Sequence, residues 1–356
     1  MRKYFIDNLR SSIVLLVVFY HIIYIFNNLG VITNVAIKGV PQMDVFLYII
    51  YPWFMVCLFL LSGISTRYAL SKKTGRQFLK ERVKKLLIPS IAGIFIIGWI
   101  SGFITNQYVD MFGGTGDSIP GFIKYLMYCA FGIGPLWFAH ELFLATLILL
   151  LLRKIDKKDK IWNLCSKVNF PILLLLVFAI WGSAHILNTP LIEIYRNGIY
   201  IFAFLLGYYV FSHDHVIEIL DKYKYVLSVI AIILGISYTV YLWGENYSTL
   251  ENLKKLITNA YAWFMILSLI GLAKRFFDKE TSFTRYMRKR NFGFYMLHYP
   301  LLILSAYLID INFHVPPLAF YFILMIIEAI LLPIAYEIVS RIPVIKALLL
   351  GIYKQK

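Results

Sequence analysis

An arginine and a histidine stand eleven residues apart in the apolar segment DNLRSSIVLLVVFYH, which runs from Asp7 to His21. Eleven residues is close to three helical turns, so Arg10 and His21 would project from one helix face, about 16 Å apart along the axis. A neutral imidazole can accept a proton, so the pair predicts chemistry near mid-membrane. The alternative is that Arg10 snorkels to the interface and His21 is a hydrogen-bonded packing residue.

Other ionisable side chains also fall inside apolar stretches. FGFYMLHYP contains His298, GPLWFAHELF contains His140 and Glu141 beside Trp137, and Glu328 lies in a third such stretch. Ionisable residues at membrane depth are rare and are commonly functional. Trp137 could instead be an aromatic anchor at the interface, and Glu328 could pair with a backbone group or a neighbouring helix. Together these residues predict a polar cavity through the helices.

The composition indicates an integral membrane protein. Of the 356 residues, 60% are hydrophobic and only 15% are charged, and the mean hydropathy is +0.73. A soluble globular protein is less apolar. The net charge of +16 does not indicate nucleic-acid binding, because no segment is long and polar enough to form a basic soluble face. Cys57, Cys129 and Cys165 are too widely spaced to suggest a metal site or a disulfide framework.

Ten apolar stretches come close to the roughly 20 residues that cross a bilayer core. No small-residue cleavage site follows the first, so we expect a retained helix rather than a signal peptide. The sequence therefore predicts an all-α fold: a polytopic membrane helix bundle of about ten transmembrane helices, forming a single domain over residues 1–356. The ten stretches are 11–30, 44–66, 86–105, 135–152, 170–188, 194–212, 225–243, 255–273, 291–309 and 317–338.

Lysine and arginine are divided unequally between alternate loops. With the N-terminus inside, 30 of the 35 fall in segments that would be cytoplasmic. Cytoplasmic loops carry such an excess, so we expect both termini to be cytoplasmic, and the positive charge needs no anionic partner beyond lipid. The longest outward connection, 106–134, contains IKYLMYCAF, which is too short to span and predicts an interfacial or re-entrant piece.

Five motifs follow one another along the chain: DNLRSSIVLLVVFYH, FLLSGIS, FLKERVKKLLIP, PLWFAHELF and NFGFYMLHYP. Together they resemble the bacterial acyltransferase-3 family of integral membrane O-acyltransferases. Each motif alone is weakly specific, whereas the ordered set is specific. The DNLR and LLSG segments are similar to the branch that includes the glucan-modifying succinyltransferase.

The resemblance implies transfer of an acetyl or succinyl group from cytoplasmic acyl-CoA to a hydroxyl of a carbohydrate or glycolipid acceptor, at the outer face of a bacterial plasma membrane. An alcohol is a poor nucleophile towards a thioester and needs a base, so His21 is the expected general base. No tightly bound cofactor, metal or nucleic-acid partner is expected. His298 and Glu141 are the other catalytic candidates, and Trp137 and His140 are the acceptor-binding candidates, in an outer vestibule with His185, Glu193 and Arg196.

Donor binding is expected at the cytoplasmic mouth, where Arg10, Arg82, Lys84 and Lys85 could hold the phosphates of acyl-CoA. The family usually has Arg-x-x-Arg where this chain has Arg82 and Lys85. Lysine holds phosphate as a point charge without the bidentate fork, so the details of donor binding differ. The alternative is that RQFLKERVKK is an amphipathic helix lying on anionic lipid.

Two other classes of function remain open at this stage. In a proton-coupled transporter the membrane-depth residues would form a proton relay, but no Gly- or Pro-broken segments occur at matching places in two halves. A non-catalytic subunit of a polysaccharide assembly or export system would leave the buried charges without a role.

Overall fold

The computed structural model describes residues 3–190 and 194–353, and it confirms the all-α membrane helix bundle. Eight helices in this part of the chain are long and apolar enough to cross a membrane, so the protein is a multi-pass membrane protein. Shorter apolar helices, α10 (Phe170–Ser183) and α11 (Asn197–Tyr209), occupy the two remaining predicted stretches. The eight spans are Tyr4–Tyr24, Pro41–Leu70, Gly75–Tyr108, Gly134–Ile155, Asp214–Tyr241, Leu256–Phe276, Ser282–Asn312 and Pro317–Arg341.

The chain divides into two compact units, and five helices contribute residues to both. They are α1 (Tyr4–Tyr24), α2 (Val45–Ile50), α4 (Gly75–Arg82), α8 (Trp137–Ile155) and α15 (Ser282–Asn312). The single domain expected for residues 1–356 stays a prediction. Unit 1 comprises Met1–Ile13, Tyr48–Glu81 and Glu141–Arg288, and unit 2 comprises Val14–Leu47, Arg82–His140 and Lys289–Lys356.

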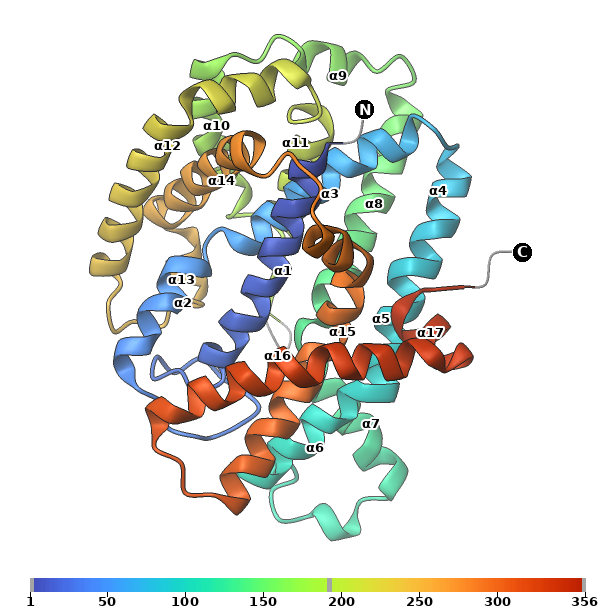
Figure 1. The fold of residues 1–356 in the computed structure, drawn as a ribbon, viewed down its shortest axis with the longest axis vertical. Helices are drawn as coiled ribbons and strands as arrows, with labels where there is room; N and C mark the ends of the chain where they lie inside the picture. The colour runs from blue at the N-terminus through green and yellow to red at the C-terminus, as the bar shows by residue number, and fades with distance from the viewer. Residues whose placement is uncertain (1–2, 191–193, 354–356) are drawn as a thin grey trace. The chain divides into compact units, whose positions relative to one another are not determined.

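Unit 1 is built on two helix pairs, in which α12 packs along α14 and α3 packs along α11 (Figure 1). The second pair approaches closely because a glycine faces each partner: a Cβ on Gly63 would lie 2.0 Å from the Phe204 carbonyl oxygen, and one on Gly207 would lie 2.0 Å from that of Leu60. Small residues permit such close helix packing in membranes. The paired helices are α3 (Phe54–Leu70), α12 (Asp214–Tyr241) and α14 (Leu256–Phe276), with α11, and unit 1 also contains α9 (Lys160–Cys165), α10 and α13 (Leu250–Lys254).

Two short antiparallel strands precede α11. Strand β1 (Asn188–Pro190) pairs with β2 (Ile194–Arg196), with Thr189 opposite Tyr195. Local caps begin two of the helices in this unit: the Asn169 side chain accepts a hydrogen bond from Ile172 N at α10, and Thr249 does the same for Asn252 N at α13.

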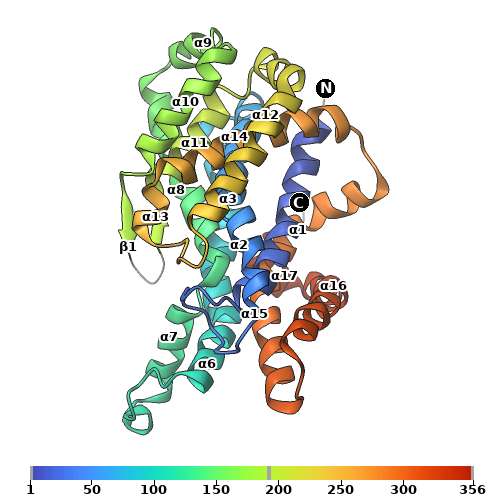
Figure 2. The same cartoon turned by 90° about the vertical axis from the view of Figure 1, so that its left-hand side faces the viewer.

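Unit 2 contains a close pair formed by α6 and α7, which lie side by side in Figure 2. The C-terminal helix α17 packs against both α5 and α16. The apolar run expected to be interfacial or re-entrant forms α7, which at 11 residues is too short to span. The helices are α5 (Ile88–Gly93), α6 (Trp99–Tyr108), α7 (Gly121–Phe131), α16 (Pro317–Arg341) and α17 (Pro343–Leu350), with short 3₁₀ turns η1 (Pro41–Asp44), η4 (Gly116–Ser118) and η5 (Gly134–Leu136).

Two π-helical segments interrupt the long helix that runs from Gly75 to Tyr108. They are η2 (Val83–Leu87) and η3 (Ile94–Gly98), on either side of α5. The basic run is thus continuous with the apolar helix, which begins well before the predicted residue 86. Helices α1 and α15 likewise begin earlier than predicted, at Tyr4 and Ser282, because hydropathy marks the membrane-embedded part of a helix and not its polar extension.

Candidate functional site

The structure brings together two of the three catalytic candidates, both in unit 2. His298 Nε2 lies 3.3 Å from His21 Nδ1, although 277 residues separate them in the chain. His21 projects from the last turn of α1, and His298 lies in the middle of α15, two residues before Pro300. Their rings are tilted by 53°, with centroids 5.1 Å apart. The pair therefore joins the first and the last of the five motifs.

Backbone carbonyls define which ring nitrogens carry protons. His21 Nδ1 lies 2.8 Å from the Val17 carbonyl oxygen, and His298 Nδ1 lies 2.8 Å from that of Tyr295. A carbonyl only accepts, so the nitrogen facing it must be an N–H in each neutral ring. The Nε2 of His298 is then an acceptor that faces His21 Nδ1–H. The Nε2 of His21 carries a lone pair, and no protein hydrogen bond reaches it within the described chain.

The two histidines differ in accessibility. His298 is fully buried, with 0% of its surface exposed, whereas His21 is partly exposed. Of the two residues, only His21 therefore has any exposed surface. His298 is placed to orient His21, in the way that an acceptor behind a catalytic histidine fixes the tautomer of its ring.

A third ring, that of Tyr299, contacts this pair and is held by a series of side-chain hydrogen bonds. These residues were not identified from the sequence as part of the site. The Tyr299 ring lies 5.1 Å from His21, and its hydroxyl donates to Asn34 Oδ1 at 2.7 Å. Asn34 in turn donates from Nδ2 to Thr105 Oγ1 at 2.7 Å, which ties α15 to α6 through the loop after α1. The sequence signal for Tyr299 was its place beside His298 in YMLHYP. Nothing in the sequence marked Asn34.

The GPLWFAHELF motif packs against the same part of α15. Gly134 has a φ of +44°, and a Cβ there would lie 2.8 Å from Cδ1 of Tyr299. Leu136 packs with Tyr295 in a buried cluster that includes Val14 of α1, and the Phe138 ring contacts Tyr295 at 5.5 Å. Part of this motif therefore has a packing role: its side chains hold the segment of α15 that carries His298.

Trp137, His140 and Glu141 begin α8, but they fall in different units. Trp137 and His140 belong to unit 2, and both are partly exposed. Glu141 belongs to unit 1, where it is 3% exposed and its Oε1 has no hydrogen-bond partner among the described residues. Their acceptor-binding and catalytic roles stay predictions.

Arg10 makes its described contacts inside unit 1. Its Nη2 donates to the Leu61 carbonyl at 3.1 Å and to Ser65 Oγ at 2.6 Å, and its Nη1 lies 3.7 Å from an Asp7 carboxylate oxygen. Leu61 and Ser65 both belong to the FLLSGIS motif. The first two motifs of the chain are therefore connected by this guanidinium.

Arg82, Lys84 and Lys85 lie in unit 2 at the start of the first π-helical segment. Lys84 and Lys85 are exposed and Arg82 is partly exposed. The Lys84 ammonium lies 5.3 Å from the centroid of the Tyr353 ring, and a Cβ on Gly351 would lie 3.0 Å from the Lys85 Cα. Gly351 and Tyr353 thus lie beside these cations.

The other residues of the expected outer vestibule are Arg196, His185 and Glu193, and their part in acceptor binding stays a prediction. Arg196 is 2% exposed, and its Nη2 donates to the Leu253 carbonyl and to Asn259 Oδ1, both at 3.4 Å. His185 is exposed, with Nδ1 2.9 Å from the Trp181 carbonyl. Glu193 lies outside the described residues.

Comparison with known proteins decides the family. An acyltransferase-domain model, that of the acyltransferase-3 family, matches residues 3–336. The chain belongs to this family. Proteins named "Glucans biosynthesis protein C" match 98% of this chain over 94% of their own length: those from Escherichia coli K12 and Shigella boydii serotype 4 are 24% identical to it, and that from Escherichia coli O157:H7 is 22% identical. No solved structure matches the chain.

One further carboxyl group of this membrane acyltransferase is buried in unit 2. Glu328 on α16 is 2% exposed, and within residues 3–190 and 194–353 neither of its carboxyl oxygens has a hydrogen-bond partner. The pairing considered for it from the sequence is therefore not made in that part of the chain. Among the same residues, no group of three or more His, Cys, Asp and Glu side chains could hold a metal ion.

Proposed function

We propose that this acyltransferase moves a small acyl group, acetyl or succinyl, from cytoplasmic acyl-CoA to a hydroxyl of a carbohydrate outside the bacterial plasma membrane. Membership of the acyltransferase-3 family supports the reaction class, and the relatives named for glucan biosynthesis support a carbohydrate acceptor. The observation that carries the mechanism is the pair of histidines, in which His298 is fully buried and His21 is partly exposed with no protein hydrogen bond to its Nε2 in the described chain.

His21 is the general base of this proposal. Its Nε2 takes the proton of the acceptor hydroxyl as the hydroxyl oxygen attacks the thioester carbonyl carbon. The carbon–sulfur bond then breaks, and the CoA thiolate leaves and takes up the proton that His21 has received. The product is an O-acyl ester and free CoA thiol, so each proton and electron pair is accounted for.

His298 serves as the positioning residue. When His21 is protonated, its Nδ1–H has two acceptors within reach, the Val17 carbonyl at 2.8 Å and His298 Nε2 at 3.3 Å. These contacts stabilise the imidazolium and keep Nε2 directed towards the substrate. Tyr299, held by Asn34, packs against the edge of the same ring and limits its rotation.

The donor is held by cations, since the pyrophosphate of CoA is strongly anionic. Arg82, Lys84 and Lys85, all in unit 2, supply this charge. A role in donor binding for Arg10, which lies in unit 1, stays a prediction. Trp137 and His140 offer a ring face and a hydrogen-bonding group to the acceptor, while Glu141 remains a further acid–base candidate. No tightly bound cofactor is needed for this reaction.

The test is acyl transfer by purified protein in lipid nanodiscs. Acetyl-CoA and succinyl-CoA are supplied separately, with and without glucose, and both free thiol and the O-acyl sugar are measured. We expect thiol release that depends on the sugar and matches ester formation in amount. Thiol release that ignores the sugar, or the absence of any ester with either donor, would overturn the proposal.

A further inference from the structure

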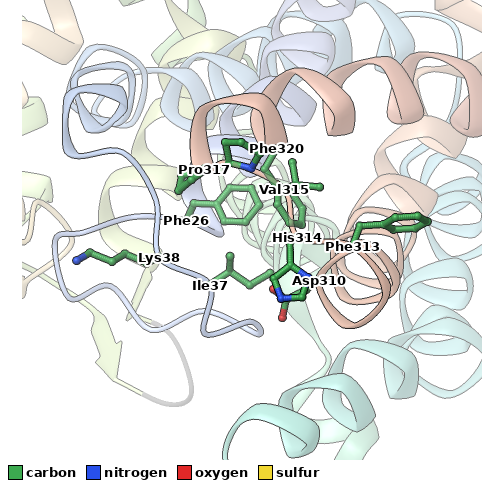
Figure 3. A pocket seen from close by; sticks show the side chains of 10 residues that line it. Phe26, Ile37, Lys38, Asp310, Phe313, His314, Val315, Pro317 and Phe320 are labelled. Atoms are coloured by element: carbon green, nitrogen blue, oxygen red, sulfur yellow. The ribbon is translucent and has the colours of Figure 1, made fainter.

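A pocket of about 440 Å³ opens in unit 2 where α1 and α15 end and α16 begins (Figure 3). Phe26, Pro317 and Phe320 form an apolar wall on one side. His314 and Asp310 lie beneath this wall in the figure, and both are exposed. Nothing in the proposed chemistry uses this pocket.

The lining combines an apolar surface, formed by the exposed Pro317 and the partly exposed Val315, with hydrogen-bonding groups. The rings of Phe26 and Phe320 are themselves buried, 1% and 3% exposed, and pack edge to face with centroids 5.1 Å apart. Asp310 accepts a hydrogen bond from the Tyr108 hydroxyl at 2.8 Å, which fixes its carboxylate at the rim. A pyranose ring has apolar C–H faces and a rim of hydroxyls, so it can pack on the apolar side chains of Pro317 and Val315 while its hydroxyls meet an imidazole and a carboxylate. The pocket is also within the usual size range for small-molecule sites.

The pocket lies beyond the histidine pair on the same helices. Phe26 is five residues past His21, a rise of about 7.5 Å if the helical path continues. Asp310 is twelve residues past His298 on α15, a rise of about 18 Å. One monosaccharide cannot place a hydroxyl at His21 and also fill this pocket, whereas a short chain of sugars can.

The geometry points to a binding subsite for a distal sugar unit of a glycan chain. The acceptor is then an oligosaccharide or polysaccharide, of which one unit is acylated at His21 while another occupies the pocket. This assignment rests on the carbohydrate acceptor proposed above. Binding at a distance from the reacting hydroxyl raises kcat/KM by positioning the acceptor, so longer acceptors react faster at low concentration.

The test compares acceptors of increasing length, from glucose to linear gluco-oligosaccharides of six units. Val315→Trp fills the pocket with a bulky ring, and His314→Ala removes a hydrogen-bonding group from its lining. Val344→Trp is the matched control, because it adds the same ring at an exposed position of α17 that does not line the pocket.

We expect kcat/KM of the unaltered protein and of the control to rise with the length of the acceptor. The two pocket variants should lose about tenfold or more with the longest acceptor and keep the value for glucose.

Two results would overturn the subsite: equal kcat/KM for glucose and the hexasaccharide in the unaltered protein, or an equal loss with both acceptors in the pocket variants. Failure of the proposed function is recognised separately, as the absence of transfer to any sugar. In that case binding of the hexasaccharide, measured by saturation-transfer NMR, still decides the pocket. Binding lost in Val315→Trp and kept in Val344→Trp supports the subsite, and equal binding by both variants refutes it.

Discussion

The two histidines of unit 2 are chemically alike but differently placed. His298 is enclosed and uses both ring nitrogens inside the protein, one towards the Tyr295 carbonyl and one towards His21. His21 is partly exposed and directs its N–H inward, which leaves its basic nitrogen without a protein partner in the described chain. A general base needs a free lone pair within reach of the substrate, so the difference in burial favours His21 over His298 as the proposed base.

At this scale the first prediction concerns His21→Ala. Removing a general base typically costs about 100-fold to 10,000-fold in rate, and we expect kcat for acyl transfer to fall by that order while acyl-CoA still binds. His215→Ala is the matched control, because His215 is also a partly buried histidine, held by the Val168 carbonyl in unit 1. Near-normal turnover in a folded His21→Ala protein would contradict the role.

The second prediction separates positioning from packing at His298. In His298→Gln an amide oxygen can still accept from His21 Nδ1–H, whereas His298→Leu fills the space without an acceptor. We expect kcat to fall much further in the leucine variant than in the glutamine variant, with KM for acyl-CoA unchanged in both. A similar loss in the two variants, in parallel with a lowered Tm, would indicate that the residue only fills space.

At the scale of the element, the basic run continues into an apolar helix through a π-helical segment. Such segments often occur at functional sites, and this one begins directly after Arg82. The third prediction is that the double variant Arg82→Gln/Lys85→Gln raises KM for acyl-CoA far more than it lowers kcat at saturation, because phosphate contacts depend on charge. KM would be measured at two salt concentrations.

The control for the donor prediction removes the same charge from the same long helix. Arg76→Gln/Lys80→Gln neutralises two exposed cations of α4, outside the positions that match the family motif. We expect this control to leave KM unchanged. If both double variants raise KM equally, donor binding does not depend on the motif positions. If neither does, the run interacts with lipid rather than with the donor.

The fourth prediction concerns the α3–α11 pair of unit 1. Gly63→Ala places a Cβ 2.0 Å from the Phe204 carbonyl oxygen, so the helices must separate. Overpacking of this kind costs about 1–3 kcal/mol, and we expect a lower Tm in detergent. Gly182→Ala on α10 is the control, because a Cβ there would meet nothing within 4 Å. Equal Tm values for the two variants would show that the close approach carries no stability.

At the scale of the whole molecule, the fifth prediction concerns the membrane topology, which we infer from the distribution of lysine and arginine. With both termini inside, Gly114 in the 106–134 connection is outside the membrane and Lys157 is in the cytoplasm. Single cysteines at these positions, in a background from which Cys57, Cys129 and Cys165 have been removed, should be labelled by an impermeant thiol reagent from opposite sides. Labelling of both from the same side would refute this topology.

The sequence alone was enough to find the helices and the family. Each of the ten predicted stretches corresponds to a helix, because transfer of a segment into lipid depends on its own residues and little on its neighbours. The five motifs likewise indicated the acyltransferase-3 family before any contact was known. Helix ends were less accurate, as at Tyr4 and Ser282, since polar turns extend a helix without changing its hydropathy.

The tertiary structure alone decided how the motifs act together. His21 was recognisable as a candidate, but its contact with His298, its partial exposure and its contact with Tyr299, which Asn34 holds, depend on which helix faces pack. Packing is set by the shapes of segments far apart in the chain, such as Gly134 against Tyr299, and no single segment encodes them. The sequence thus determined which groups are available for chemistry, while the fold determined which nitrogen is free to perform it.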